Sequence, residues 1–297
     1  MAWTMYRLAF RLLSPLHVGH LKQGNLQRTR PYLTGKALWG ALTARLTREG
    51  GSNDYQHIGK QVNEGLAFSY FFPSTDSAQV TLFPWDDERR FAWCYLNTYA
   101  STALDYERNA ALEGSLHETE YLAPVTRNGE PVCLVGYIFE KREDGCNLAW
   151  QGALHRLQPR WCARWLRRSN HLAWQGALHR LQLGGERTYG WGRVGLEDKP
   201  QEITDFLCGW QVDLSGDRPK LHARSDSSAE PRAYAHVYTK NLSARGLIEP
   251  FLGRETQAAG KHGQTLSQAS ICWAPGALLQ GTQSLIIAEN GLWRAAN

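Results

Sequence analysis

The sequence lacks several features that define large classes of protein. It contains no run of about 18 apolar residues, so we expect no helix that spans a membrane. Its N-terminal apolar stretch is short and interrupted by Arg7 and Arg11, unlike a signal peptide. The six cysteines of the 297 residues form no CxxC pair, which disfavours a zinc site and predicts free thiols. We therefore expect a cytoplasmic protein without a metal or cofactor.

Common catalytic motifs are also missing. No GxSxG elbow is present, and the LTGKALWG segment is no Walker A loop, because Arg30 and Ala37 replace its first glycine and its Ser/Thr. Residues 14–35 contain no Asp or Glu, so this segment is not expected to supply carboxylate-assisted or metal-assisted cleavage. The acidic run Asp86–Arg90 is interpreted as a solvated turn.

Positive charge is concentrated in two segments. Residues 1–48 carry eight Lys or Arg and no acid, and residues 151–193 carry eight Arg and one acid. These segments carry +8 and +7, and the whole chain carries +5, so the remaining residues together carry −10. This distribution indicates a localised polyanion site, unless acidic neighbours in space neutralise the two segments.

The first 50 residues predict a strand, a long basic loop and a helix. Thr4–Leu13 alternates apolar and polar residues, which is typical of a half-buried strand. Residues 14–35 contain loop-forming residues, and Lys36–Arg48 places leucines on one helical stripe after Thr34, a potential N-cap. Together these elements suit the first half of a split βαβ unit.

The middle of the chain predicts more strands and a projecting insertion. Residues 102–124 are polar and are interpreted as the insertion. The expected strands are Gly65–Pro73, Gln79–Trp85 and Glu130–Lys141. The segment LAWQGALHRLQ occurs at 148–158 and again at 172–182, which indicates a local duplication because a solenoid needs at least three repeats. Its second copy fits a short helix on the sheet, and a closing strand is expected after residue 191.

Beyond residue 200 we expect a smaller α+β domain. Residues 202–214 alternate as in a strand, and Ser215–Arg232 is polar and is predicted to be a surface loop. An Asn-Gly pair at 290–291 lies between apolar arms, which indicates a hairpin turn.

The segment LGGERTYGWGRVG, residues 183–195, combines five glycines with two arginines and two aromatic residues. Its expected order of helix, loop and strand excludes a Rossmann fingerprint. Glycines permit close backbone approach, while arginines pair with phosphates and aromatic rings stack on bases, so the segment predicts an RNA-binding surface loop. The alternative is a tight structural turn. The candidate residues are Gly184, Gly185, Arg187, Tyr189, Gly190, Trp191, Gly192 and Arg193.

Three motifs in this order resemble the RAMP superfamily of CRISPR-associated proteins. They are SPLHVG after the first strand, PYLTGKALWGAL at the first helix, and LGGERTYGWGRV before the last strand. The resemblance covers residues 1–197. It implies a ferredoxin-like (RRM-like) domain over 1–198, with a thumb-like insertion near 86–130 and the glycine-rich loop at 183–195, and a smaller α+β domain over 199–297, with a second RAMP-type domain as the alternative.

The resemblance also implies a function. Similar proteins hold guide RNA (crRNA) in type III effector complexes, beside other RAMP subunits and a large subunit, with target RNA near the thumb. Target-cleaving subunits carry an aspartate after the first strand, and this chain has none there. We therefore expect a non-catalytic subunit that caps the 5′ handle of crRNA or forms part of the backbone. The first segment would contribute His17, Gly19, His20, Lys22, Arg28, Arg30, Lys36 and Trp39.

The alternative is a metal-independent endoribonuclease that processes repeat RNA. His17 and His20 lie three residues apart, and a pair of histidines can act as base and acid when a 2′-hydroxyl attacks the adjacent phosphate.

Overall fold

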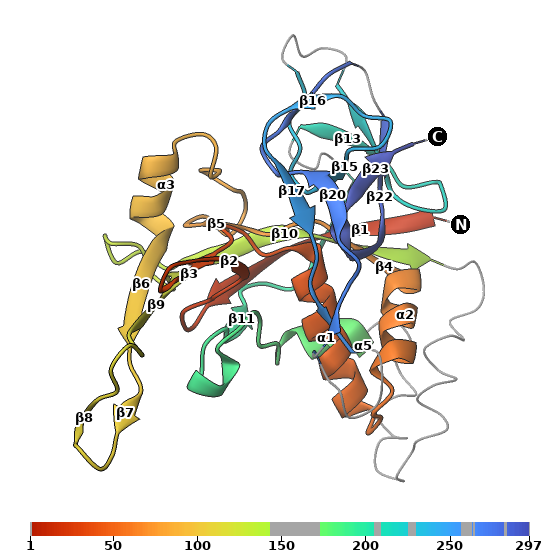
Figure 1. The fold of residues 1–297 in the computed structure, drawn as a ribbon. Helices are drawn as coiled ribbons and strands as arrows, with labels where there is room; N and C mark the ends of the chain where they lie inside the picture. Colours follow the sequence, from red (N-terminus) through yellow and green to blue (C-terminus); the bar gives the residue numbers. More distant parts are fainter. Residues whose placement is uncertain are drawn as a thin grey trace.

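The computed structural model describes residues 2–142, 173–204, 209–224, 230–256, 263, 265–281 and 284–296. The chain is a mixed α+β structure with two main sheets, a set of helices and a projecting arm (Figure 1). The first copy of the duplicated segment lies outside the described residues.

The N-terminal part forms an antiparallel sheet around a long first strand. Its strands are β1 (Ala2–Leu12), β4 (Leu66–Phe68), β5 (Phe72–Ser74), β10 (Cys133–Arg142), β11 (Val194–Leu196) and β12 (Gln201–Ile203). They follow the order β11-β1-β10-β4, with β12 beside β1 and β5 beside β10. The first and third strands of a βαββαβ unit are therefore central, which agrees with the predicted ferredoxin-like arrangement.

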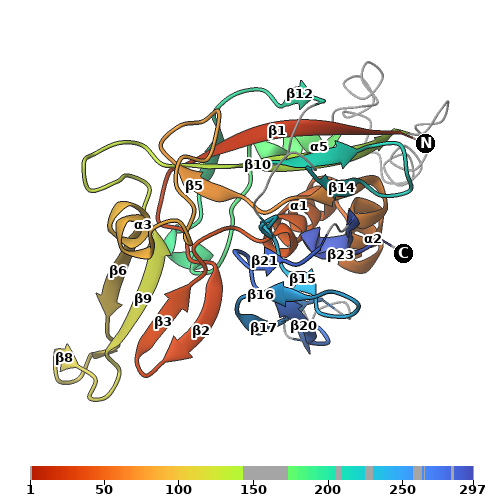
Figure 2. The ribbon, with the colours of Figure 1, turned by 90° about the horizontal axis from the view of Figure 1, so that it is seen from above.

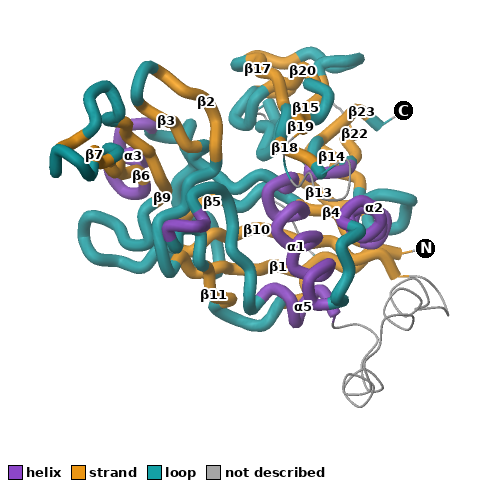
Figure 3. Tube along the Cα trace, turned by 60° about the horizontal axis from the view of Figure 1, so that its bottom comes forward, coloured by secondary structure: helices purple, strands orange, loops and turns teal. Residues whose placement is uncertain are grey.

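Helices cover one face of this sheet, as Figure 3 shows. They are α1 (Gly35–Glu49), α2 (Tyr55–Gly65) and α5 (Ala173–Leu178). The predicted cap is confirmed, since the Thr34 hydroxyl accepts a hydrogen bond from the Ala37 amide. Alternation along β1 directs Leu8 and Phe10 into the core beneath the helices, while Trp3 and Met5 enter a second core on the opposite face.

The C-terminal part packs over that opposite face. Its main sheet has the order β13-β14-β22-β23-β15-β20-β17. The strands are β13 (Trp210–Asp213), β14 (Lys220–Ala223), β15 (Val237–Tyr238), β17 (Ile248–Phe251), β20 (Ser270–Trp273), β22 (Ser284–Ile287) and β23 (Trp293–Ala295). Two small ladders pair β16 (Ala244–Arg245) with β21 (Leu278–Leu279), and β18 (Arg254–Glu255) with β19 (Thr265–Leu266).

The structure corrects two expectations for the C-terminal part. The predicted loop Ser215–Arg232 contains strand β14, because Leu221 alternates inward and is fully buried. The described residues after 199 contain strands and the 3-10 turn η3 (Glu289–Gly291) but no α-helix, so the helical component comes from the N-terminal part. The hairpin predicted at Asn290-Gly291 is confirmed, with β22 and β23 as its arms.

The projecting arm is the predicted insertion (Figure 2). It consists of α3 (Glu88–Tyr95), β6 (Leu96–Ser101), β7 (Leu104–Asp105), β8 (Ala110–Ala111) and β9 (His117–Leu122). The run interpreted as a solvated turn is instead the start of α3, because the Asp87 carboxylate accepts from the Arg90 amide as an N-cap.

Two further corrections concern segments next to the arm. The expected loop 14–35 contains a hairpin of β2 (Gly19–Gln23) and β3 (Leu26–Thr29), which joins the arm in a sheet of order β2-β3-β9-β6. The turn residue Gly24 has φ of +59°, as a two-residue hairpin turn requires. The strand expected at Gln79–Trp85 is absent, because Phe83 and Trp85 stack on each other and pack on Tyr234.

Candidate RNA-binding surface

The glycine-rich loop 183–195 lies against the chain that leaves β1. The Gly185 amide donates to the His17 carbonyl at 2.8 Å, and the Gly192 amide donates to the Pro15 carbonyl at 2.7 Å. At Gly192, with φ of +75°, an added Cβ would collide with the Leu183 carbonyl oxygen. The close approach predicted for these glycines is thus made to the protein's own backbone.

Residues 187–190 and Arg193 of this loop face solvent. The 3-10 turn η2 (Arg187–Tyr189) carries the Tyr189 ring, which is 79% exposed. Arg187 and Arg193 are exposed, and neither forms an ion pair with any residue that the structure describes. Gly190 has φ of +83° and open space where a Cβ would lie. This side of the loop presents two free cations beside an exposed ring.

Trp191 connects the loop to the arm. Its ring makes edge contacts with Tyr121 of β9 at 5.1 Å and Tyr99 of β6 at 6.1 Å between centroids. Tyr121 and Tyr99 lie on the same face of the arm, because Tyr99 is directly across from Thr119, which is two residues from Tyr121 on β9 and shares its face. The ring expected to stack on a base therefore positions the loop against the insertion.

The base of the β2–β3 hairpin is held by Glu120 of β9. Its carboxylate accepts from the Arg28 Nε and from the Thr29 amide, both at 3.0 Å, and its carbonyl accepts from His17 Nδ1 at 2.7 Å. His17 is buried, whereas Gly19 and Lys22 are exposed. Because Glu120 is 91 residues from Thr29, nothing in the local sequence indicates this contact.

Other cations of the first segment contact acidic residues of the C-terminal part. Arg30 Nη1 donates to Glu249 at 2.7 Å, His20 Nε2 lies 3.0 Å from the other oxygen of that carboxylate, and Lys36 Nζ donates to Glu255 at 2.6 Å. The Arg30 and Lys36 side chains are each only 10% exposed. These two cations thus hold the two halves of the chain together.

His236 completes the cluster around Glu249. Its Nε2 donates to the carboxylate, while its Nδ1 accepts from the Tyr70 hydroxyl at 2.6 Å. Burial lowers the pKa of His236, so the ring is neutral. Burial alone would raise the pKa of Glu249, but hydrogen bonds from His20 and His236 and the charge of Arg30 lower it well below 4.5. Sequence reasoning missed both residues.

Trp39 was expected to bind RNA but packs inside the protein, whereas Arg11 was not expected to bind RNA but is exposed. The Trp39 indole donates to the Gly59 carbonyl at 2.9 Å and packs α1 on α2. Arg11, which is absent from the predicted set, is exposed on β1 directly across from Gly195. The signal for Arg11 was its polar position in the alternation of β1.

The described part of the chain contains no group of three or more His, Cys, Asp or Glu side chains arranged to hold a metal ion. No helix in those same ranges is long and apolar enough to cross a membrane. Cys94, Cys133 and Cys272 are free thiols, and the other three cysteines lie outside these ranges.

The chain was compared with known proteins. Three similar solved chains come from cryo-EM structures of the Type III-B Cmr-beta complex. The chain in the complex bound to cognate target RNA and AMPPnP has 13% identity and a TM-score of 0.46, over 92% of this chain and 85% of that one. The chain in the complex bound to cognate target RNA has 12% identity and a TM-score of 0.46, over 92% and 86%. The chain in the apo state has 13% identity and a TM-score of 0.40, over 68% and 98%.

No curated protein sequence matches the chain, but a protein-family model does. The model of the RAMP superfamily matches residues 9–195, which hold the end of β1, the helix α1, the arm and the glycine-rich loop. Since this match covers more than half of the chain, the protein belongs to the RAMP superfamily.

Proposed function

We propose that this protein is a guide-RNA-binding subunit of a type III CRISPR effector complex. The observation that carries the proposal is the solvent-facing side of loop 183–195, where Arg187 and Arg193, neither of them ion-paired with a described residue, flank the exposed Tyr189. Guanidinium groups pair with phosphates and a tyrosine ring stacks on a base, which is how single-stranded RNA is held without sequence reading. Membership of the RAMP superfamily supports this assignment.

The RNA path is proposed to follow the exposed cations around the loop. Arg193 lies two residues before Gly195, which is directly across from Arg11 in the sheet. The β2–β3 hairpin adds Lys22 and the partly exposed Arg28. Arg30 and Lys36 are left out of this path because their charges are paired and mostly buried. The crRNA 5′ handle is the proposed occupant.

The arm is proposed to contact the duplex of guide and target RNA. Its distal half exposes four large side chains, three leucines and a tyrosine, and the tyrosine, Tyr106, is 84% exposed. Apolar side chains that enter between base steps separate stacked bases, as in proteins that kink nucleic acid. The exposed residues are Leu104, Tyr106, Leu112 and Leu116.

The division into domains at 1–198 and 199–297 also remains a proposal.

The proposed role is non-catalytic, and an endoribonuclease is the alternative. One observation favours the alternative, because Glu249 orients the exposed His20 imidazole as a carboxylate orients a general base. His17 is buried and donates to a carbonyl. The double substitution His17→Ala with His20→Ala should leave crRNA maturation in cells intact; loss of mature crRNA with retained RNA binding would establish the alternative.

The RNA-binding proposal is tested by titrating single-stranded RNA at several salt concentrations. Four exposed cations, Arg11, Lys22, Arg187 and Arg193, predict a log–log slope of about −3, at about −0.7 for each phosphate contact. Arg187→Ala with Arg193→Ala should weaken binding and reduce the slope by about 1.4. The matched control Arg48→Ala with Lys60→Ala removes the same charge from α1 and α2 and should change neither. A slope near zero, or equal loss in both pairs, contradicts the proposal.

A further inference from the structure

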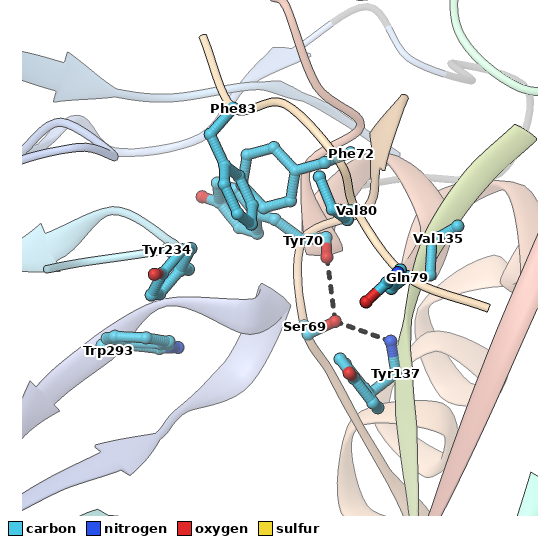
Figure 4. A pocket seen from close by; sticks show the side chains of 10 residues that line it. All are labelled: Ser69, Tyr70, Phe72, Gln79, Val80, Phe83, Val135, Tyr137, Tyr234 and Trp293. Carbon is cyan, nitrogen blue, oxygen red and sulfur yellow. Dashed lines mark hydrogen bonds between the residues drawn. The ribbon is translucent and has the colours of Figure 1, made fainter. Parts of the chain in front are cut away.

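Two of the cavities in the described part of the chain differ in their chemistry. One, of about 170 Å³, is lined by residues of β10 and β23 among others, and six of its ten side chains are aromatic while none is charged (Figure 4). The Ser69 hydroxyl in its wall already donates to the Tyr70 carbonyl at 2.9 Å and accepts from the Tyr137 amide at 2.7 Å. This lining indicates no class of ligand.

The second cavity has charged side chains at its rim. It has a volume of about 270 Å³ and lies where the arm joins the N-terminal sheet, between α3, the turn 126–130 and the segment 75–82. We call it the arm-base pocket. In Figure 1, α3 lies at the top of the arm, well apart from the glycine-rich loop beside β11. The arm-base pocket is therefore separate from the RNA-binding surface proposed above.

Two arginines line the arm-base pocket. Arg90 and Arg127 are exposed, and neither forms an ion pair with any residue that the structure describes. Arg127 is held in place, because its Nε donates to the Trp93 carbonyl at 3.2 Å and its Cζ lies 4.4 Å from the centroid of the Trp93 ring. Its terminal nitrogens remain as donors for a ligand, and a positioned guanidinium loses less conformational entropy on binding a phosphate.

Glu130 sets the net charge of the arm-base pocket. Its carboxylate lines the pocket with the two guanidiniums, so the three side chains together carry +1. A phosphodiester of RNA carries one negative charge, whereas a phosphate monoester carries about −1.5 to −2 at neutral pH. The exposed Asn128 adds an uncharged amide donor. The charge balance therefore favours a phosphodiester.

Trp93 adds a surface for a base. Its side chain is 54% exposed although it lies on α3 beside the pocket. Exposed aromatic rings next to cations are the parts from which proteins build sites for single-stranded nucleic acid, because a base stacks on the ring while its phosphate meets the cation. A cavity of about 150 Å³ accommodates one benzene molecule, so a pocket of 270 Å³ has room for a phosphate with its sugar. An acidic protein segment would use the arginines but gain little from the ring.

We propose that the arm-base pocket holds one phosphodiester of single-stranded RNA between Arg90 and Arg127, with a neighbouring base on the Trp93 ring. This inference rests on the proposed function, because it adds a second RNA contact at the other side of the arm.

The experiment titrates the full chain with an oligouridine long enough to contact both surfaces, at several salt concentrations. Arg90→Ala should weaken binding about tenfold, the value of one charge-assisted hydrogen bond, and reduce the log–log slope by about 0.7, the value of one phosphate contact. Arg89→Ala is the matched control, because Arg89 is the neighbouring exposed arginine of the same helix and does not line the pocket. It should change neither quantity.

A second variant tests the sign of the charge. Glu130→Gln removes the one carboxylate of the pocket and should strengthen RNA binding about threefold, on the scale of a single charge pair near water. Both Arg90 and Glu130 are exposed, so neither substitution should disturb the fold, and a melting curve checks this. Photocrosslinking with 4-thiouridine in the RNA should modify Trp93 in the native chain, and the crosslink should be lost in Arg90→Ala.

Three results would overturn the inference. Equal RNA affinity of Arg90→Ala and Arg89→Ala, without a crosslink at Trp93, refutes the pocket as an RNA site. If Arg187→Ala with Arg193→Ala still weakens binding in that case, the proposed function stands; no RNA binding by the native chain refutes both. Binding of polyglutamate that Arg90→Ala abolishes, with RNA affinity unchanged, assigns the pocket to an acidic protein partner instead.

Discussion

The glycine-rich loop 183–195 and the basic segment 14–36 meet at the base of the arm, and they use their cations differently. In the loop, Arg187 and Arg193 point to solvent without an ionic partner among the described residues. In the basic segment, Arg30 and Lys36 are mostly buried against glutamates of the C-terminal part. The loop leaves Arg187 and Arg193 available to a ligand, whereas the basic segment uses Arg30 and Lys36 for folding.

This difference teaches that local charge density is a poor measure of a binding surface. A cation contributes to polyanion binding only when no acidic side chain has already neutralised it. The glutamates that neutralise the basic segment lie 219 residues away for both Arg30 and Lys36. Three predictions test the contrast, from the largest expected effect to the smallest.

The first prediction concerns the buried side of the glycine loop. Gly192→Ala should destabilise the protein by at least about 3 kcal/mol, since left-handed backbone costs about 1–2 kcal/mol and the new Cβ also meets the Leu183 carbonyl. Gly190→Ala, also at positive φ but with open space, should cost only the backbone strain. Denaturant unfolding measures both.

This result would also correct an expectation from the sequence. A surface loop predicts that valines at 190 and 192 cost RNA binding more than stability, whereas the packing of Gly192 on Pro15 and Leu183 predicts the reverse at that position. Equal, small losses of stability for Gly190→Ala and Gly192→Ala would show that the loop does not pack as described.

The second prediction concerns the ionic cluster of the basic segment. Glu249→Gln should lower the free energy of unfolding by about 3 kcal/mol, because it leaves the buried Arg30 without its counter-charge. Glu230→Gln is the control, since its ion pair with Arg245 is exposed and should contribute less than about 1 kcal/mol.

The effect of Glu249→Gln should depend on pH. The pKa of Glu249 is lowered in the folded protein, so its contribution is fully present above the ordinary value of 4.5 and is lost as pH falls below that value. The difference in stability between the native chain and Glu249→Gln should therefore be constant from about pH 6 to about pH 8, where an ordinary glutamate is ionised, and shrink in acid. A difference that grows in acid would contradict the assignment.

The third prediction compares one cation from each segment. Arg187→Ala should weaken RNA binding by about 1 kcal/mol and leave the melting temperature unchanged, because its guanidinium contacts no acidic group among the described residues. Lys36→Ala should do the opposite, lowering stability by about 1 kcal/mol with little change in RNA binding. Similar loss of RNA binding in both variants would remove the distinction between the two segments.

Much of the central fold was predictable from the sequence, because local rules determine it. Alternation identified β1, a composition rich in β-branched and aromatic residues identified β10, and Thr34 with its leucine stripe identified α1. The second duplicated segment formed α5, and its Trp174 and Leu178 are buried as expected. The Asn290-Gly291 turn adopts positive φ at both residues, as the pair predicts. These features depend on backbone preference and period alone.

Other elements were decided by contacts that the local sequence does not contain. The aromatic segment 79–85 has strand-like composition but packs as a ring stack on Tyr234, which comes from the other half of the chain. The hairpin at 14–35 carried a readable Gly24-Asn25 turn signal, yet its pairing with the arm arises only when β3 meets β9.

The sequence by itself determined the family, the order of the central elements and which loop carries glycines, arginines and aromatic rings together. Only the tertiary structure decided which of those groups are available to a ligand. Glu249 and Glu255 neutralise Arg30 and Lys36, Glu120 holds His17 and Arg28, and Trp191 turns to the arm. Charge pairing and burial depend on distance in space, and residues more than 90 positions apart acquire that proximity only when the chain folds.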